Sequence, residues 1–133
     1  AVLSADMFGM VTTNPDDLNI GQVLEYAEPY FDYIAPMTYP SHYPNGFNGY
    51  PNPNKEVYGV IKYSMDQAVR RMNEASTSPS KIRPWLQDFD YGGNYGIAEV
   101  RAQIQAVYDA GLDSWMLWDP ANIYTKDALL KDM

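Results

Sequence analysis

The chain has 133 residues, 46% of them hydrophobic and 20% charged, which is typical of a single folded domain spanning residues 1–133. Its net charge of −8 has the wrong sign for a nucleic-acid-binding surface, and the lack of cysteine excludes disulfide scaffolds and thiolate sites. No segment has the length and apolarity of a membrane span, and residues 1–10 lack a signal-peptide pattern, so the compartment stays undecided, with the extracellular space and cell envelope both open.

The first part of the chain contains two predicted strands and one predicted helix. Residues 2–8 are a short apolar run without helical spacing, which predicts a strand. Asn19 can cap a helix that Pro29 ends. Its apolar stripe consists of Ile20, Val23, Leu24 and Ala27. Residues 32–39 predict the second strand, in which Pro36 indicates a bulge or an irregular stretch.

A long segment without hydrophobic periodicity follows the second strand. Residues 40–56 contain four prolines, two glycines and four asparagines. A segment of this length inside a compact domain is either disordered or functional. Its aromatic residues favour a functional loop.

The next helix and strand follow the loop, where hydrophobic periodicity returns. Apolar residues at helical spacing predict a helix through about Ala75. They are Met65, Ala68, Val69 and Met72. Residues 82–89 predict the third strand, and three glycines make residues 91–96 another loop.

The last part of the chain repeats the alternation of helix and strand. A third predicted helix ends at Gly111, which suits a left-handed C-terminal cap. One face of it is formed by Ile97, Val100, Ile104 and Val107. Residues 113–119 predict the fourth strand, and Thr125 can cap a last helix that carries Leu129 and Leu130.

Four consecutive strand-then-helix units, of about 33 residues each, predict an α/β fold with a parallel sheet. An open doubly wound sheet usually carries a glycine-rich phosphate loop after its first strand, and residues 4–16 contain none. A closed barrel of eight such units needs about 250 residues. We therefore favour half of a (β/α)8 TIM barrel, whose two edge strands must be covered by further sequence, by a partner chain or by rearrangement.

Acidic side chains occur at or just beyond the ends of three predicted strands. They are Asp6, Asp88, Asp90 and Asp119. In a parallel barrel these ends face one side, where the loops build the active site. Asp6 also interrupts an apolar strand, where a buried carboxylate must be paired or must serve chemistry. Because glycoside hydrolysis uses two carboxylates, the pattern favours this reaction.

Aromatic side chains surround the same strand ends and offer flat surfaces for sugar rings. Those we assign to substrate binding are Tyr39, Tyr43, Trp85 and Trp118. The acidic residue Asp90 is also assigned to substrate binding. Of Trp115 and Trp118, at least one is expected to pack in the core. His42 is the one histidine of the sequence and is either a solvated loop residue or part of the site. One histidine and no calcium-loop spacing leave no predicted metal or cofactor.

Several segments resemble the C-terminal half of a bacterial family of formally unknown function, which is labelled a putative glycoside hydrolase domain. They are residues 4–25, 30–54, 83–92 and 115–124. The most specific stretches read PMTYPSHYPNGF and RPWLQDFD. The resemblance implies an eight-stranded barrel distantly related to the α-amylase and α-galactosidase groups, in which these four strands are the fifth to eighth.

The resemblance also implies roles for individual residues. Asp6 in S-A-D-x-F-G and Asp88 in W-L-Q-D-F are the candidates for acid or base and for binding sugar hydroxyls. The candidate subsite contacts are Tyr39, His42, Gln87, Trp118 and Asp119. Barrels of this kind carry a catalytic carboxylate at the end of the fourth strand, which this chain does not include, so we expect a weak or inactive hydrolase in isolation.

Two functions remain open from the sequence. One is part of a glycoside hydrolase acting on a polysaccharide or oligosaccharide; the other is a noncatalytic carbohydrate-binding or cell-wall-associated module. The expected partners are a carbohydrate substrate and either the N-terminal half of the barrel or a second copy of the chain.

Overall fold

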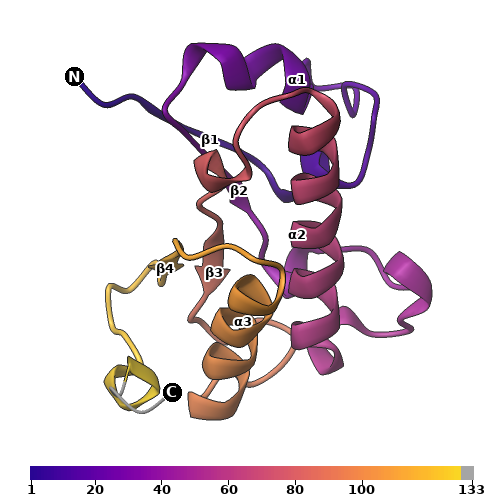
Figure 1. Cartoon of the computed structure of the whole chain (residues 1–133). Coiled ribbons are helices and arrows are strands. Elements are labelled where there is room, and N and C mark those ends of the chain that lie inside the picture. Colours follow the sequence, from indigo (N-terminus) through magenta and orange to yellow (C-terminus); the bar gives the residue numbers. More distant parts are fainter. Residues whose placement is uncertain (130–133) are drawn as a thin grey trace.

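Four parallel strands form one sheet in the order β1-β2-β3-β4 (Figure 1). The computed structural model describes residues 1–129. The strands are β1 (Ser4–Phe8), β2 (Tyr33–Met37), β3 (Trp85–Gln87) and β4 (Met116–Trp118). Because each neighbouring pair is parallel, the carboxyl ends of all four strands lie at the same end of the sheet. The predicted α/β fold with a parallel sheet is confirmed.

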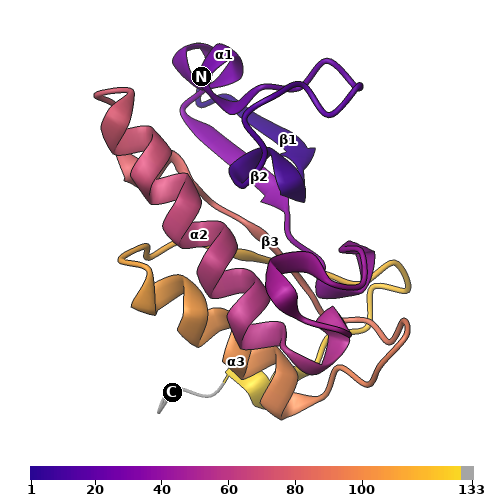
Figure 2. The same cartoon turned by 90° about the vertical axis from the view of Figure 1, so that its right-hand side faces the viewer.

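Two long helices cover one face of this sheet. They are α2 (Val57–Glu74) and α3 (Ile97–Asp109), which pack against each other, and α2 crosses in front of the β3 segment in Figure 2. After α3 the chain turns at Gly111, whose φ of +85° glycine adopts without strain, as predicted. The largest buried side chains of the core include Ile34, Met65, Met72, Leu86 and Ile104.

The opposite face of the sheet is not covered by α2 or α3. Side chains alternate between the two faces of a strand, so the neighbours of core residues point away from the helices. We call this surface the open face. Its residues include Asp6, Phe8, Met37, Trp85, Met116 and Trp118. Phe8 and Trp118 are 52% and 42% exposed, although strands of a parallel sheet are normally buried on both faces.

The first helix is much shorter than predicted. α1 spans Leu24–Ala27, so the helix predicted to start at Asn19 is wrong. Leu18 and Asn19 both have a φ of +57°, and this left-handed backbone cannot continue into a right-handed helix. The carboxylates of Asp16 and Asp17 stabilise the turn because they accept hydrogen bonds from the N–H groups of Leu18 and Asn19.

Pro36 lies inside β2 in a continuous register with β1, so the predicted bulge is wrong. The carbonyl of Ile34, two residues earlier, accepts a hydrogen bond from Arg83 on the β3 side at 2.9 Å. The N–H that proline lacks would point in the same direction. Consequently β2 keeps its pairing with β1 and shares one register pair with β3, Met37 with Trp85.

The loop over residues 40–56 is ordered by three 3-10 turns, Pro40–His42, Phe47–Gly49 and Pro53–Lys55. These turns satisfy backbone groups locally, so the long segment holds a defined shape without a regular element. The predicted third and fourth strands extended further than the observed β3 and β4 at both ends.

Among the described residues, the segment after β4 contains a 3-10 helix, Lys126–Leu129, where a helix capped by Thr125 was predicted. The Thr125 hydroxyl and N–H both donate hydrogen bonds to Asp88. Leu130, which was predicted to continue the helix, lies outside the described residues.

Candidate functional site

On the open face, an acidic side chain of β1 lies beside one tryptophan of β3 and another of β4. Trp85 Nε1 donates a hydrogen bond to Asp6 Oδ1 at 2.8 Å. The rings of Trp85 and Trp118 meet edge to face, with centroids 5.9 Å apart. Asp6 is exposed, so the expectation of a buried carboxylate is wrong, because no helix covers this side of β1. The Trp85 indole orients one Asp6 oxygen and leaves the carboxylate accessible.

Tyr39 follows the end of β2 and interacts electrostatically with Asp6. Burial raises the pKa of Tyr39 to about 12, and nearby Asp6 and Tyr124 add to the shift. Tyr39 therefore keeps its phenolic proton at neutral pH and can donate a hydrogen bond to a ligand. The structure thus brings together four of the predicted site residues: Asp6, Tyr39, Trp85 and Trp118.

Asp88 lies just beyond β3 and is 4% exposed. Its Oδ2 accepts a hydrogen bond from the Thr125 N–H at 2.7 Å, and its Oδ1 accepts one from the Thr125 hydroxyl at 2.6 Å. Two short bonds to a carboxylate are strong enough to hold it in a buried position. Asp88 therefore joins the end of β3 to the segment after β4.

The other two acidic residues predicted at strand ends bind backbone groups of their own loops. Asp119 is 7% exposed, and its Oδ2 accepts a hydrogen bond from the Ile123 N–H at 2.7 Å. Asp90 is exposed, and its Oδ1 accepts one from the Tyr95 N–H at 2.8 Å. Each carboxylate shapes the loop that follows its strand.

His42 belongs to a group of rings at the carboxyl end of β2 and β3, which we call the aromatic cluster. Its members are Tyr39, His42, Phe89 and Tyr91. The His42 ring lies 5.6 Å from Tyr39 and 5.8 Å from Tyr91 between centroids. The cluster joins the loop after β2 to the loop after β3, and it includes two of the predicted substrate contacts.

Gln87, a predicted subsite contact, is fully buried at the end of β3. Its backbone is held from both sides by Gln103 of α3, which accepts from the Gln87 N–H and donates to the Gln87 carbonyl, both at 2.9 Å. Its side chain turns to the loop after β2 and binds Ser41. Gln87 therefore acts on the site through Ser41, not through an exposed surface of its own.

A cavity of about 530 Å³ opens beside the aromatic cluster, and we call it the rim cavity. It is lined by Phe8, Gly9, Met10, Leu18, Ile20, Met37, Tyr39, His42 and Tyr43. Most of this lining is apolar, so the cavity suits the apolar face or an apolar substituent of a ligand. A Cβ at Gly9 would lie 2.4 Å from the Met37 carbonyl oxygen, so this close approach of β1 and β2 requires glycine.

Tyr43, which was predicted to contact a sugar, is a buried anchor of the loop. Its ring packs against Phe47 at 4.5 Å between centroids, and its hydroxyl lies 3.3 Å from the Ser64 hydroxyl of α2. Burial raises the pKa of Tyr43 well above its ordinary value. Only part of its surface reaches the rim cavity, and most of the ring belongs to the core.

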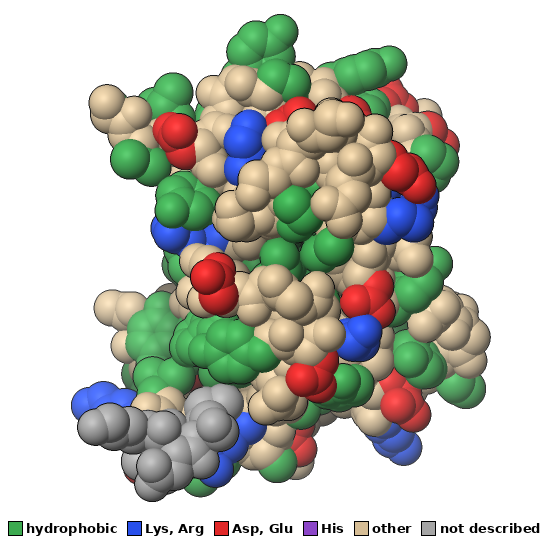
Figure 3. Space-filling view, in the orientation of Figure 1, with side chains coloured by type: hydrophobic (Ala, Val, Ile, Leu, Met, Phe, Trp, Pro, Cys, Tyr) green, Lys and Arg blue, Asp and Glu red, His purple; other side chains and the backbone are tan. Residues whose placement is uncertain are grey.

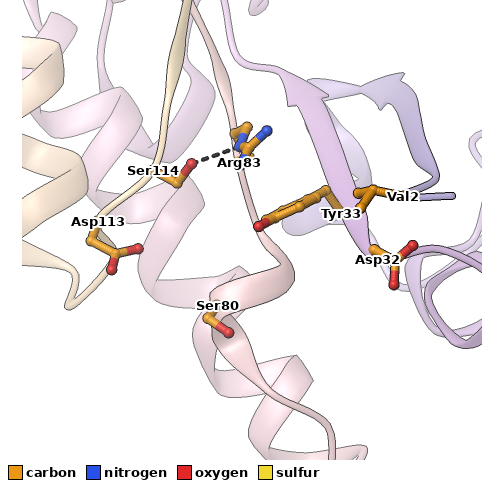
Figure 4. Close-up of a pocket in the computed structure, with 7 residues that line it drawn as sticks. All are labelled: Val2, Asp32, Tyr33, Ser80, Arg83, Asp113 and Ser114. Atoms are coloured by element: carbon orange, nitrogen blue, oxygen red, sulfur yellow. Dashed lines mark hydrogen bonds between the residues drawn. The ribbon is translucent and has the colours of Figure 1, made fainter.

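A second cavity, of about 600 Å³, lies at the opposite end of the strands (Figure 4). The Arg83 guanidinium sits 3.8 Å above the centroid of the Tyr33 ring, and its Nε donates to the Ser114 hydroxyl at 2.6 Å. Asp32 and Asp113 also line this cavity. In parallel α/β barrels the amino ends of the strands contribute stability, and catalysis takes place at the carboxyl ends.

Several residues of the site carried no local signal in the sequence. Ser41 was not among the predicted contacts, and Met10, Leu18 and Ile20 of the rim cavity looked like ordinary apolar positions. Phe89 would have been recognisable as one more aromatic residue directly after a strand. The contacts of Ser41 could not have been found, because they join residues far apart in the sequence.

Within residues 1–129 there is no group of three or more His, Cys, Asp or Glu side chains that could hold a metal ion. In the same part of the chain, no helix has the length and apolarity needed to cross a membrane. In the view of Figure 3, acidic and basic side chains are interspersed with hydrophobic ones. The surface seen there therefore offers contacts of mixed character.

Comparison with known proteins adds one match. The profile of a family described as "Putative glycosyl hydrolase domain" matches residues 1–124. The comparisons with curated proteins and with solved structures found no match.

Proposed function

Because the chain belongs to this family of glycosyl hydrolase domains, we propose that the open face and the aromatic cluster bear part of a carbohydrate site. The observation that carries the proposal is the Asp6 carboxylate, which is oriented by Trp85 and lies on an exposed surface beside Trp118. Aromatic rings stack against the C–H faces of sugars, and a carboxylate binds their hydroxyl groups or transfers protons. The substrate class is a polysaccharide or an oligosaccharide.

In this proposal the residues have different roles. Asp6 is the acid, the base or the ligand of sugar hydroxyls, and Trp85 positions it. Trp118 and Tyr39 bind the sugar, because Trp118 is 42% exposed and Tyr39 keeps its proton at neutral pH. Asp88 is a positioning residue, because its two oxygens are bonded to Thr125.

Hydrolysis of a glycosidic bond needs a second carboxylate, at about 5–5.5 Å from the first for retention or 6.5–9.5 Å for inversion. Three of the predicted acids are held by hydrogen bonds: Asp90 and Asp119 within their own loops, and Asp88 by Thr125 in the segment after β4. We therefore expect the isolated chain to bind sugar and to hydrolyse it weakly or not at all. In a complete (β/α)8 barrel these strands are the fifth to eighth.

A noncatalytic carbohydrate-binding module is the second candidate. The engagement of Asp88, Asp90 and Asp119 by backbone groups favours it, because it leaves the aromatic surface as the main ligand contact. A module of this kind binds through Trp118 and Tyr39 and tolerates neutralisation of Asp6.

Calorimetric titration with a panel of neutral oligosaccharides tests these proposals. Trp118→Ala and Tyr39→Ala should each weaken binding about tenfold or more, whereas Tyr30→Ala, at an exposed tyrosine just after α1, should leave it unchanged. Loss of turnover by Asp6→Asn in a complete barrel that contains these residues, with binding retained, supports the enzyme. Equal binding by Trp118→Ala and the unchanged chain contradicts the carbohydrate site.

We also infer that the open face is completed by a partner, either further β/α units or a second copy of the chain. β1 and β4 each pair with one neighbour in the described sheet, and exposed edges of this kind invite pairing. Light scattering at high protein concentration tests the second copy. A dimer that Trp118→Arg dissociates supports it, and a monomer at all concentrations refutes it.

A further inference from the structure

The side chain of His42 is connected to the buried end of β3 through a short chain of hydrogen bonds. Gln87 Oε1 lies 3.2 Å from the Ser41 N and 3.0 Å from Ser41 Oγ. Ser41 Oγ in turn lies 2.9 Å from Nδ1 of His42. The Gln87 side chain also donates from Nε2 to the Phe89 carbonyl at 3.0 Å.

Two backbone groups fix the direction of every proton in this chain. The Ser41 N–H can only donate and the Phe89 carbonyl can only accept, so the Gln87 amide has one satisfactory orientation, with Oε1 toward Ser41. An amide oxygen only accepts, so the Ser41 hydroxyl uses its single proton on Gln87. The oxygen of Ser41 must therefore accept from His42, which places a proton on Nδ1.

From this network we infer that neutral His42 is held as the Nδ1–H tautomer and uses Nε2 as a hydrogen-bond acceptor for a sugar hydroxyl. This inference rests on the proposed carbohydrate site. His42 is exposed and lines the rim cavity, and among residues 1–129 Nε2 has no hydrogen-bond partner. Tyr39 and Tyr91, whose rings lie beside it, offer flat surfaces on which the same sugar can stack.

The acceptor also selects the class of ligand. A lone pair on Nε2 attracts a hydroxyl proton and repels an anionic oxygen, and the Asp6 carboxylate on the open face has the same preference. The apolar lining of the rim cavity provides no compensating cation. The site therefore takes a neutral, hydroxyl-rich saccharide and discriminates against uronic and sulfated sugars. His42 is thus a specificity-determining residue of the proposed site.

Because His42 is the one histidine in the sequence, its imidazole gives a single set of nitrogen signals. Long-range proton–nitrogen correlation spectra of the full chain, recorded where the imidazole is neutral, should show a protonated Nδ1 and an unprotonated Nε2. Ser41→Ala removes the acceptor for Nδ1–H and should move the population toward Nε2–H. Ser80→Ala, at a serine in a different turn, is the matched control and should leave the signals unchanged. A predominant Nε2–H form in the unchanged chain overturns the inference.

The role in binding is tested with neutral and uronic oligosaccharides of equal length. His42→Phe retains an aromatic ring and removes the acceptor, so affinity for the neutral ligand should fall about five- to tenfold. His42→Gln, whose amide oxygen can replace Nε2, should retain affinity within about twofold to threefold. Unchanged binding by His42→Phe, or a preference for the uronic ligand, refutes the acceptor role. Absence of binding to any sugar refutes the proposed function instead, and the tautomer result then stands separately.

Discussion

The carboxylate of Asp88 provides a quantitative test of how the end of the sheet is held together. Asp88→Asn keeps one oxygen that can accept from the Thr125 N–H, and its NH2 group can donate to the Thr125 hydroxyl, which then turns to accept. Both contacts, at 2.7 and 2.6 Å in a position that is 4% exposed, lose the charge of the carboxylate. A hydrogen bond contributes about 1.5–3 kcal/mol to a charged group and about 0.5–1.5 kcal/mol to a neutral one, so each of the two loses about 1–1.5 kcal/mol. We expect the free energy of unfolding to fall by about 2–3 kcal/mol.

Thermal and urea unfolding followed by circular dichroism measure this change. For a chain of this length, each 1 kcal/mol corresponds to a Tm shift of roughly 3–5 °C, so the Tm should fall by about 6–15 °C. Asp90→Asn is the matched control, because an asparagine oxygen can still accept from the Tyr95 N–H, and it should change the stability by less than about 1 kcal/mol.

A double-mutant cycle identifies the partner. If Thr125 is the reason for the effect, Asp88→Asn and Thr125→Val should be strongly non-additive, with an interaction free energy of about 1 kcal/mol or more. A variant Asp88→Asn with full stability would refute the reasoning. Loss of turnover in a complete barrel without loss of stability would instead return Asp88 to a direct catalytic role.

Three other variants test separate parts of the structure. Glu25→Gln breaks the ion pair with buried Arg71, whose hydrogen bond is the main cause of the lowered pKa of Glu25. The free energy of unfolding at pH 7 should fall by about 1–3 kcal/mol, since Glu25 is 35% exposed. The folded-state pKa of Glu25 lies below the ordinary value of a glutamate, so this stabilisation is complete above the ordinary pKa and is lost as the pH falls through the lowered one. Urea unfolding of the two proteins should therefore converge in acid, and a difference that persists there contradicts the assignment. Gly9→Ala should destabilise the chain by about 1–3 kcal/mol, because the added Cβ meets the Met37 carbonyl. Gly111→Ala should destabilise it less, because the added Cβ has open space and only the backbone is strained. Equal losses of stability in denaturant unfolding rule out the steric cause. Trp85→Phe removes the N–H donor to Asp6. Calorimetry should show oligosaccharide binding about threefold to tenfold weaker, with little change in Tm. Unaltered affinity argues against Asp6 as a ligand contact.

The strands of the sheet could be predicted from the sequence, but the contacts that hold the carboxyl end of the sheet together could not. Alternation of apolar segments with helical periods predicted four strands and the two long helices, because these patterns are local. The turn at Asp16 and Asp17 was not predicted by the same reasoning, since two left-handed residues, Leu18 and Asn19, lie where Asn19 was predicted to cap a helix. In that segment, hydrogen bonds from side chains to the backbone outweighed the apolar spacing.

The residue types of the sequence indicated which residues could form the site, but not which role each of them has in the structure. Asp6, Tyr39, Trp85 and Trp118 were predicted together and lie together. Asp88 carried the same signal as Asp6, an acidic residue after an apolar strand, yet its partner Thr125 is 37 residues away. Long-range pairing of this kind decides whether a carboxylate is presented to a ligand or held inside the fold.

The three tryptophans of the chain allow the most direct test of the carbohydrate site. Each indole N–H gives its own signal in a proton–nitrogen correlation spectrum. Trp85 and Trp118 lie on the open face, whereas the Trp115 indole donates to the Tyr108 hydroxyl at 3.0 Å and the ring packs against the core. Titration with a neutral oligosaccharide should shift the signals of Trp85 and Trp118 and leave that of Trp115 in place. Shifts confined to Trp115, or no shift of any indole at saturating sugar, would contradict a carbohydrate site on the open face.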